Sequence, residues 1–341
     1  MKRYLSILIA LLCLTSCFEH KELCYTHSEH AQSYHVNIVA DYRCDWEEHY
    51  GGPKWQEVWP ENYIDYESLR PAKPEGLRVV VYDKEGNHIT HNIKPEGGVV
   101  SIYKDLNDLL FYNNDTEYIV FSTTSNDVTT RATTRATTRS RMRSTYLGSE
   151  FANEGEQTLT APDMLYANYY TDHLAEKVVE PVDLPVTLQP LVFTYKVRYE
   201  FESGLEYVMR ARGALTGMAS SVLLNTGETS SEPATLLYDC DMTDFGARAR
   251  VNSFGIPSFP NQHYPPRTEN KHSLNLEVLL KNGKTVNFNW DVTDQVSQQP
   301  HGGVIVIEGI VIEEEDGMEG SGAFDVTVND WGEYEDIIIP L

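Results

Sequence analysis

The feature that most constrains the fold is a pair of alternating segments around a short turn that contains glycine. Segments 274–280 and 286–292 both carry their apolar side chains at even positions. A two-residue Asn-Gly turn would place these two apolar sets on opposite faces of the hairpin. A three-residue loop at 281–283, with Gly283 in the left-handed conformation, places them on one face. This register pairs Val278 with Val286 and Leu276 with Phe288, so the sequence predicts an antiparallel hairpin with one face toward a core.

Short segments of similar character recur along the chain, and helical periodicity is nearly absent. We expect further strands at residues 34–39, 77–82, 99–103, 117–122, 186–188, 191–199, 304–312, 324–328 and 337–341. Turn signals separate them, as at 83–87, where Gly86 supplies a positive φ. Many short strands with turns and long interruptions are typical of antiparallel β-sandwiches. The sequence therefore predicts an all-β protein.

The N-terminus predicts export and lipid anchoring. After a basic start comes an apolar run of about eleven residues, whereas a membrane-spanning helix needs roughly 20. The run ends in Leu-Thr-Ser-Cys17, which resembles the bacterial lipobox, whose cysteine is acylated. We expect residues 1–16 to be a signal peptide and Cys17 to hold the protein at the outer membrane through its lipid. A plain signal peptide with an incidental cysteine is the alternative, and the acidic residues just after Cys17 resemble a surface-export tail of Bacteroidetes lipoproteins.

The remaining chain is too long for one ordinary core and suits two domains. We expect a lipidated stalk at 17–33, an N-terminal β-sandwich at 34–185 and a C-terminal β-sandwich at 186–341. Segment 129–143 repeats Thr-Thr-Arg-Ala and carries no acidic residue. We interpret it as an exposed, mobile Arg-rich loop that buries no face. A protease-sensitive site and an anchor for an acidic partner are the functional alternatives.

Charge and cysteine content limit the possible partners. The net charge is −24, from 27 basic and 51 acidic residues, which argues against nucleic acid or an anionic lipid surface as a partner. Beyond Cys17, the cysteines are Cys24, Cys44 and Cys240. Their odd number leaves at least one thiol free or paired between chains, and the pairing stays open.

Sequence motifs give no sign of catalysis. The chain has no Gly-x-Ser-x-Gly elbow, Walker loop or dinucleotide fingerprint, so we expect no enzyme, catalytic residue or cofactor. The spacing of His27, His30 and His35 does not match a zinc site, and the acidic run 313–316 reads as a solvated turn rather than a calcium loop, so we expect no metal. Segment 213–219 is small and apolar, and we interpret it as a close-packed connection.

An aromatic stretch is the best binding candidate that the residues themselves offer. It contains Trp46, Trp55 and Trp59, followed by Tyr63 and Tyr66, beside several carboxylates. Such rings suit a protein partner or a glycan. The alternative is that they pack over the sheet of the first domain.

Several motifs resemble the fimbrillin-like lipoproteins of Bacteroidales, the anchor and accessory subunits of type V pili. Besides the lipobox, they are segments 77–83, 97–98, 112–117, 215–219, 290–296 and 322–331. The resemblance implies two tandem transthyretin-like sandwich domains and fimbrial subunits as partners, with a strand of one subunit filling a groove in its neighbour.

The chain departs from the stalk subunits of that family. Those subunits are trimmed by an Arg-specific protease near the first strand, whereas the arginines here cluster at 131–143, well past it. The resemblance therefore favours an anchor or accessory subunit. A surface glycan-binding lipoprotein is the alternative function, and an unrecognised hydrolase is a third.

Overall fold

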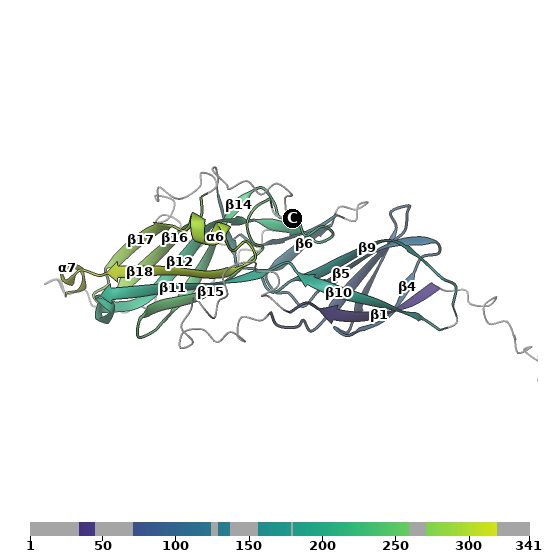
Figure 1. The fold of residues 1–341 in the computed structure, drawn as a ribbon, viewed down its shortest axis with the longest axis horizontal. Coiled ribbons are helices and arrows are strands. Elements are labelled where there is room, and N and C mark those ends of the chain that lie inside the picture. Colours follow the sequence, from purple (N-terminus) through teal and green to yellow (C-terminus); the bar gives the residue numbers. More distant parts are fainter. Residues whose placement is uncertain are drawn as a thin grey trace, which may run out of the picture.

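The computed structural model describes residues 34–44, 71–123, 129–136, 156–178, 180–258 and 271–318. Figure 1 shows two β-rich regions side by side along the long axis of the molecule. Within the described ranges, no helix is long and apolar enough to cross a membrane. The protein is all-β, as the sequence predicts.

The first region is a seven-stranded sheet of order β3-β2-β5-β9-β10-β1-β4. Its strands are β1 (Tyr34–Tyr42), β2 (Leu77–Tyr82), β3 (His88–Ile93), β4 (Gly97–Ile102), β5 (Leu106–Asn113), β9 (Tyr166–Leu174) and β10 (Val182–Pro190). The predicted strands at 34–39, 77–82 and 99–103 are confirmed. Strand β10 runs through the expected domain boundary between 185 and 186 and pairs with β1 and β9, so the first sheet extends to Pro190.

The second region is an eight-stranded sheet of order β17-β16-β12-β14-β15-β11-β18, with β8 also paired to β14. Its strands are β8 (Gln157–Thr160), β11 (Phe193–Ser203), β12 (Val208–Ala219), β14 (Pro233–Met242), β15 (Gly246–Ser253), β16 (Ser273–Leu280), β17 (Thr285–Asp291) and β18 (Gly303–Val311). Most strand pairs are antiparallel, as the sequence predicts, whereas β1–β10, β11–β18 and β8–β14 are parallel pairs that no local pattern predicted.

The hairpin prediction is confirmed in its register and its turn. Val278 lies opposite Val286 and Leu276 opposite Phe288, and Gly283 has a φ of 83°. The apolar even-numbered residues of β16 enter the core of the second region. The prediction of a single buried face was too narrow for β16, which is buried along its whole length, whereas β17 exposes its odd-numbered residues.

A third sheet corrects the interpretation of the Arg-rich segment. Strands β6 (Ile119–Thr123), β7 (Thr130–Thr134) and β13 (Ser221–Leu223) form it, with β7 in the middle. Thr130, Ala132 and Thr134 are buried, and the arginine between the first two points to solvent. Residues 130–134 therefore form a strand with a buried face, and the prediction of an exposed, mobile loop is wrong for them. The rest of the segment, 137–143, lies outside the described residues.

This third sheet joins the two regions. Its β6 and β7 precede β9 in the chain, whereas β13 belongs to the second region. One apolar cluster contains Ala132 of β7, Val222 of β13, Val80 and Leu110 of the first sheet, and Phe254 beyond β15. The two regions therefore share a core rather than being linked by a single flexible segment.

Two further segments differ from expectation. Residues 213–219 belong to β12, so they form a strand and not a connection, although their close packing is real: a Cβ on Gly213 would lie 2.1 Å from the ring of Tyr238. The acidic run ends in a short exposed helix, α7 (Glu314–Gly317). Another short helix, α6 (Thr293–Ser297), follows β17 and was not predicted.

Candidate functional site: the edges of the sheets

The two outermost strands of the first sheet are connected by a turn. β3 and β4 follow one another through residues 94–97, where the Gly97 N–H donates to the Lys94 carbonyl at 3.0 Å. His91 Nε2 on β3 lies 3.0 Å from the Ser101 carbonyl oxygen on β4. At the same corner Gly97 packs against β1, because a Cβ there would lie 1.9 Å from the Ile38 carbonyl oxygen. These contacts bring the two edges of this sheet together.

The second sheet has a different arrangement, because its outermost strands β17 and β18 are not consecutive in the chain. Among the described strands, β17 pairs only with β16, and β18 only with β11. Helix α6 lies against β18. A strand with one unpaired side presents a row of backbone N–H and C=O groups, which is the ordinary template for adding another strand. The β17 edge is therefore the candidate interaction site of the described chain.

An aromatic strip accompanies the β17 edge. Val286, Phe288 and Trp290 are half-buried and pack against the core of the second region. The rings of Phe288 and Trp290 are stacked, with centroids 5.6 Å apart and an interplanar angle of 8°. The ring of Trp290 also packs against the ring of Tyr199, with centroids 5.8 Å apart. A strand added beside β17 could cover the exposed part of these rings, so the edge combines polar backbone groups with apolar surface.

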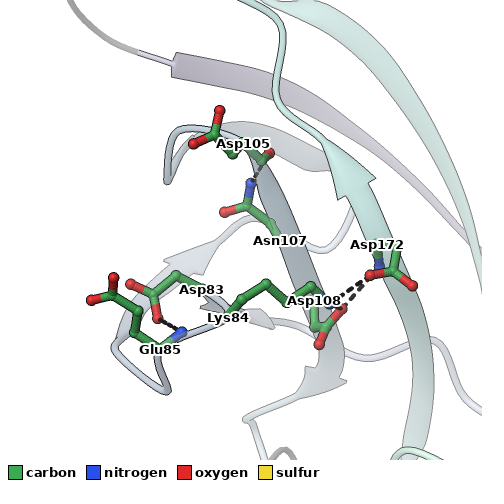
Figure 2. A network of polar contacts seen from close by, with 7 residues as sticks. All are labelled: Asp83, Lys84, Glu85, Asp105, Asn107, Asp108 and Asp172. Atoms are coloured by element: carbon green, nitrogen blue, oxygen red, sulfur yellow. Dashed lines mark hydrogen bonds and ion pairs between the residues drawn. The ribbon is translucent and has the colours of Figure 1, made fainter.

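A polar network lies at one end of the first sheet (Figure 2). Lys84 extends between two carboxylates: its Nζ lies 2.8 Å from Asp108 Oδ1 and 2.7 Å from Asp172 Oδ1. Asp108 Oδ1 also accepts the backbone N–H of Asp172 at 2.9 Å. In the turn before β3, Asp83 Oδ1 accepts the backbone N–H of Glu85 at 2.9 Å, which stabilises the turn that the sequence predicts.

The electrostatics of this network indicate a structural role. Burial alone would raise the pKa of Asp108, but the hydrogen bonds from Lys84 and from the Asp172 amide outweigh it and lower that pKa. Burial and the nearby Asp108 charge raise the pKa of Tyr169 to about 12. Lys84 and the Asp172 amide both bond to Asp108, and Lys84 also pairs with the Asp172 carboxylate, so the network fastens the turn after β2 to β5 and β9 and offers no free ligand set. Across the described ranges, no group of three His, Cys, Asp or Glu side chains could hold a metal ion.

The site residues predicted from the sequence lie outside the described residues. These are Cys17 and the three tryptophans, Trp46, Trp55 and Trp59, so acylation and glycan or partner contact stay predictions. Phe288 and Trp290 were predicted only as core residues of the hairpin. The polar odd-numbered residues of β17 indicate that one face of the strand is exposed, but they do not show that the strand lies at the edge of a sheet.

The cysteines are resolved in part. Cys44 and Cys240 are both free thiols, and Cys24 lies outside the described ranges. Cys44 Sγ lies 3.6 Å from the Tyr166 hydroxyl. Burial, followed by the neighbouring carboxylates, raises the pKa of the Cys240 thiol, which keeps it neutral and unreactive.

Comparison with known proteins places the chain in a family. A protein of Bacteroides ovatus named "Putative fimbrium anchoring subunit Fim4B" is 22% identical over 243 residues, 69% of each chain. The crystal structure of a "putative adhesin" from the same species is 20% identical, covers 85% of this chain and 93% of its own, and has a TM-score of 0.53, so the two share a fold. The fimbrial anchor protein Mfa2 of Porphyromonas gingivalis is 11% identical over 80% of this chain and 90% of its own, with a TM-score of 0.42.

The model of a family described as Domain of unknown function (DUF5119) matches residues 61–239. Because that match spans more than half of the sequence, the chain belongs to the DUF5119 family.

Proposed function

We propose that this chain is a cell-surface lipoprotein that serves as a fimbrial anchor or accessory subunit and has no enzymatic activity. The observation that carries the proposal is its similarity to Fim4B, whose name describes a fimbrium anchoring subunit, over 69% of both chains. The lipobox ending in Cys17 supports attachment to the outer membrane. Each acyl chain adds about 0.8 kcal/mol per buried methylene, and several chains together make a stable anchor.

The proposed partner is a fimbrial subunit that adds an extended segment to the β17 edge. Three features of β17 support this. Its outer side has no paired strand among the described residues, its inward side chains Phe288 and Trp290 are half-buried, and its outward side chains are polar. Backbone hydrogen bonds would supply part of the affinity, and apolar side chains of the incoming strand would supply specificity by covering the two rings.

Paired substitutions on the two faces of β17 test the binding edge. We expect Phe288→Ala with Trp290→Ala to weaken binding of a purified fimbrial subunit from the same organism at least tenfold, measured by biolayer interferometry. The matched control is Asn287→Ala with Asn289→Ala, which changes the exposed face of the same strand and should leave binding within about twofold. Equal binding by both double variants would rule out the β17 edge.

A genetic experiment tests the wider role. In a strain that lacks this chain, we expect fimbriae to be released into the medium, and expression of the wild-type chain should restore their retention. Expression with Cys17→Ala should not restore it, because the anchor would be missing. Unchanged fimbrial retention and length after deletion would refute the proposed function.

A further inference from the structure

The last described residues are tied to the turn that precedes β17. Asn282 Nδ2 donates to the carbonyl oxygens of Asp316 at 2.7 Å and of Met318 at 3.0 Å. Lys284 Nζ lies 3.9 Å from Asp316 Oδ1. Figure 1 shows α7 at the end of the second region that lies farthest from the first. Residues 319–341, which we call the tail, therefore leave the described part of the chain beside the start of β17.

The register of the hairpin shows which backbone groups of β17 face its open side. The Leu280 N–H donates to the Lys284 carbonyl at 2.8 Å, and hydrogen-bonded pairs alternate with non-bonded pairs along an antiparallel ladder. The even-numbered residues of β17 therefore bond to β16. The backbone groups of its odd-numbered residues, including Asn287 and Asn289, face the side where none of the described strands pairs with β17.

Segment 323–329 of the tail has the length and the alternation of β17. β17 has seven residues, with its half-buried apolar side chains at even positions. The apolar residues of the tail segment are also even-numbered: Phe324, Val326 and Val328. Because the tail starts beside the first residue of β17, a strand that it formed along this edge would run parallel to β17. Residues side by side in paired strands point to the same face, so the apolar tail residues would cover the rings of Phe288 and Trp290.

The connection and the charges also suit this arrangement. Residues 319–322 are Glu-Gly-Ser-Gly, which span up to about 13 Å and carry two glycines for the turn onto the edge. Asp325 is the one charged residue of 323–329, and it would lie on the outer face, where β17 carries asparagine at 287 and 289. No like charges therefore oppose each other along the middle of the strand.

The other outer strand of this sheet does not compete for the tail. The backbone of β18 is already bonded by two side chains, since Gln299 Nε2 donates to the Val304 carbonyl at 2.8 Å and Gln295 Nε2 to the Val306 carbonyl at 3.1 Å. Of the two outer strands, β17 is thus the one whose outward backbone groups have no partner in the described chain.

We propose that the tail adds segment 323–329 to β17 as a parallel edge strand, with Val326 beside Phe288, and that this self-contact covers the fimbrial binding edge until a subunit displaces it. The contact itself requires no partner, whereas its role as a cover rests on the proposed function. A short connection gives the tail an effective concentration in the millimolar range, so an incoming strand has to compete with it. The apparent affinity of a subunit falls in proportion to the fraction of chains whose edge is covered.

Serine substitutions on the two faces of the tail test the contact. The chain from residue 17, with Cys17→Ala to prevent acylation, is compared with the same chain carrying Val326→Ser and Val328→Ser. The matched control carries Thr327→Ser and Asn329→Ser, which change the opposite face of the same segment and leave its apolar residues in place. None of these substitutions alters the charge of the tail, so any difference reports on the apolar face.

Hydrogen exchange resolved to single amides is the measurement, at two protein concentrations that differ tenfold. We expect the Asn287 and Asn289 amides to be protected in the parent chain and in the control, equally at both concentrations. In the Val326→Ser, Val328→Ser variant these two amides should exchange at least tenfold faster, because the tail loses the apolar contacts that hold it. The Phe288 amide bonds to β16 and should change by less than about twofold.

Binding of a purified fimbrial subunit from the same organism tests the cover separately. The valine double variant should bind the subunit at least fivefold more tightly than the parent chain, and the control should bind like the parent. Equal affinity of the parent and the valine variant would overturn the role of the tail as a cover. If the subunit bound none of the three proteins while the exchange results were as expected, the tail contact would stand and the fimbrial function would fail.

Three exchange results would overturn the contact. Free exchange of Asn287 and Asn289 in the parent chain would show that the edge is open. Equal protection in both double variants would show that something other than the apolar face of the tail covers it. Protection that rises with protein concentration would identify a second copy as the occupant. If the valine double variant loses its circular dichroism signal, Val326→Ser alone is read by the same criteria.

Discussion

A buried pair of tyrosine hydroxyls allows a quantitative test of how the second core is stabilised. Tyr199 on β11 and Tyr238 on β14 are 0% and 6% exposed, and their hydroxyl oxygens lie 2.7 Å apart. Burial raises the pKa of both phenols well above the ordinary value, so both are neutral across the physiological range. Each hydroxyl therefore depends on the other for its hydrogen bond in an apolar environment.

Removing one hydroxyl leaves the other buried without its partner. A buried polar group that loses its partner costs about 1–3 kcal/mol, so Tyr199→Phe and Tyr238→Phe should each lower the free energy of unfolding by that amount. Replacing both by phenylalanine removes the unpaired group and keeps the two rings in place. The double variant should therefore lie within about 1 kcal/mol of the wild type, less destabilised than the sum of the single variants.

Urea unfolding, monitored by circular dichroism, measures the free energy of unfolding of the wild type, the two single variants and the double variant. The values can be compared if the slope of the transition is the same for all four proteins. The coupling energy is the sum of the two single costs minus the cost of the double variant, and it should be at least about 1 kcal/mol. If the double variant cost as much as the two single variants added together, the hydroxyls would not act as a pair, and the reasoning would be refuted.

Three further predictions concern separate parts of the molecule. Cys17→Ala should move the protein from the membrane fraction to the soluble fraction and abolish palmitate labelling, and a variant still acylated would contradict the lipobox assignment. Gly97→Ala should cost more than about 2 kcal/mol in urea unfolding, because its Cβ would meet the Ile38 carbonyl oxygen at a φ of 120°; Gly227→Ala, with a φ of 72° and only an ordinary contact with Leu191 at 3.5 Å, is the milder control. Asp108→Asn should lower the melting temperature at pH 7, and the difference from wild type should shrink below about pH 4, because the lowered pKa of Asp108 contributes stability above its unfolded value that is lost on acidification. An equal difference at pH 7 and pH 3 would count against that role for Asp108.

Local patterns in the sequence predict much of the fold. The hairpin at 274–292 could be predicted down to its register, because the positions of its apolar residues exclude a two-residue turn and a three-residue loop with Gly283 puts them on the same face. The strand at 77–82 is confirmed with the bounds that we expected. In both cases the pattern and the turn residues specify the same structure.

The arrangement between strands could not be predicted in the same way. Parallel pairing of β1 with β10 joins residues such as Val36 and Val182, which no local pattern connects. The hydrogen bonds from the Gln295 and Gln299 side chains to the backbone of β18 could not be predicted either, because backbone groups leave no mark in the sequence. The wrong interpretation of 130–134 has another cause: threonine and alanine are weakly apolar, so their alternation with arginine looked like low complexity although those positions are buried.

The four-residue repeat of the Arg-rich segment has a consequence for how this part of the chain can vary. In a strand the side chains alternate with a period of two, and four is a multiple of two. Thr130 and Thr134 accordingly occupy equivalent buried positions, and Arg131 and Arg135 are both exposed. Gain or loss of one Thr-Thr-Arg-Ala unit would shift β7 along its neighbours without exchanging its inner and outer faces. A single inserted residue would reverse them, so this strand tolerates changes in length only in steps that keep its residues in phase.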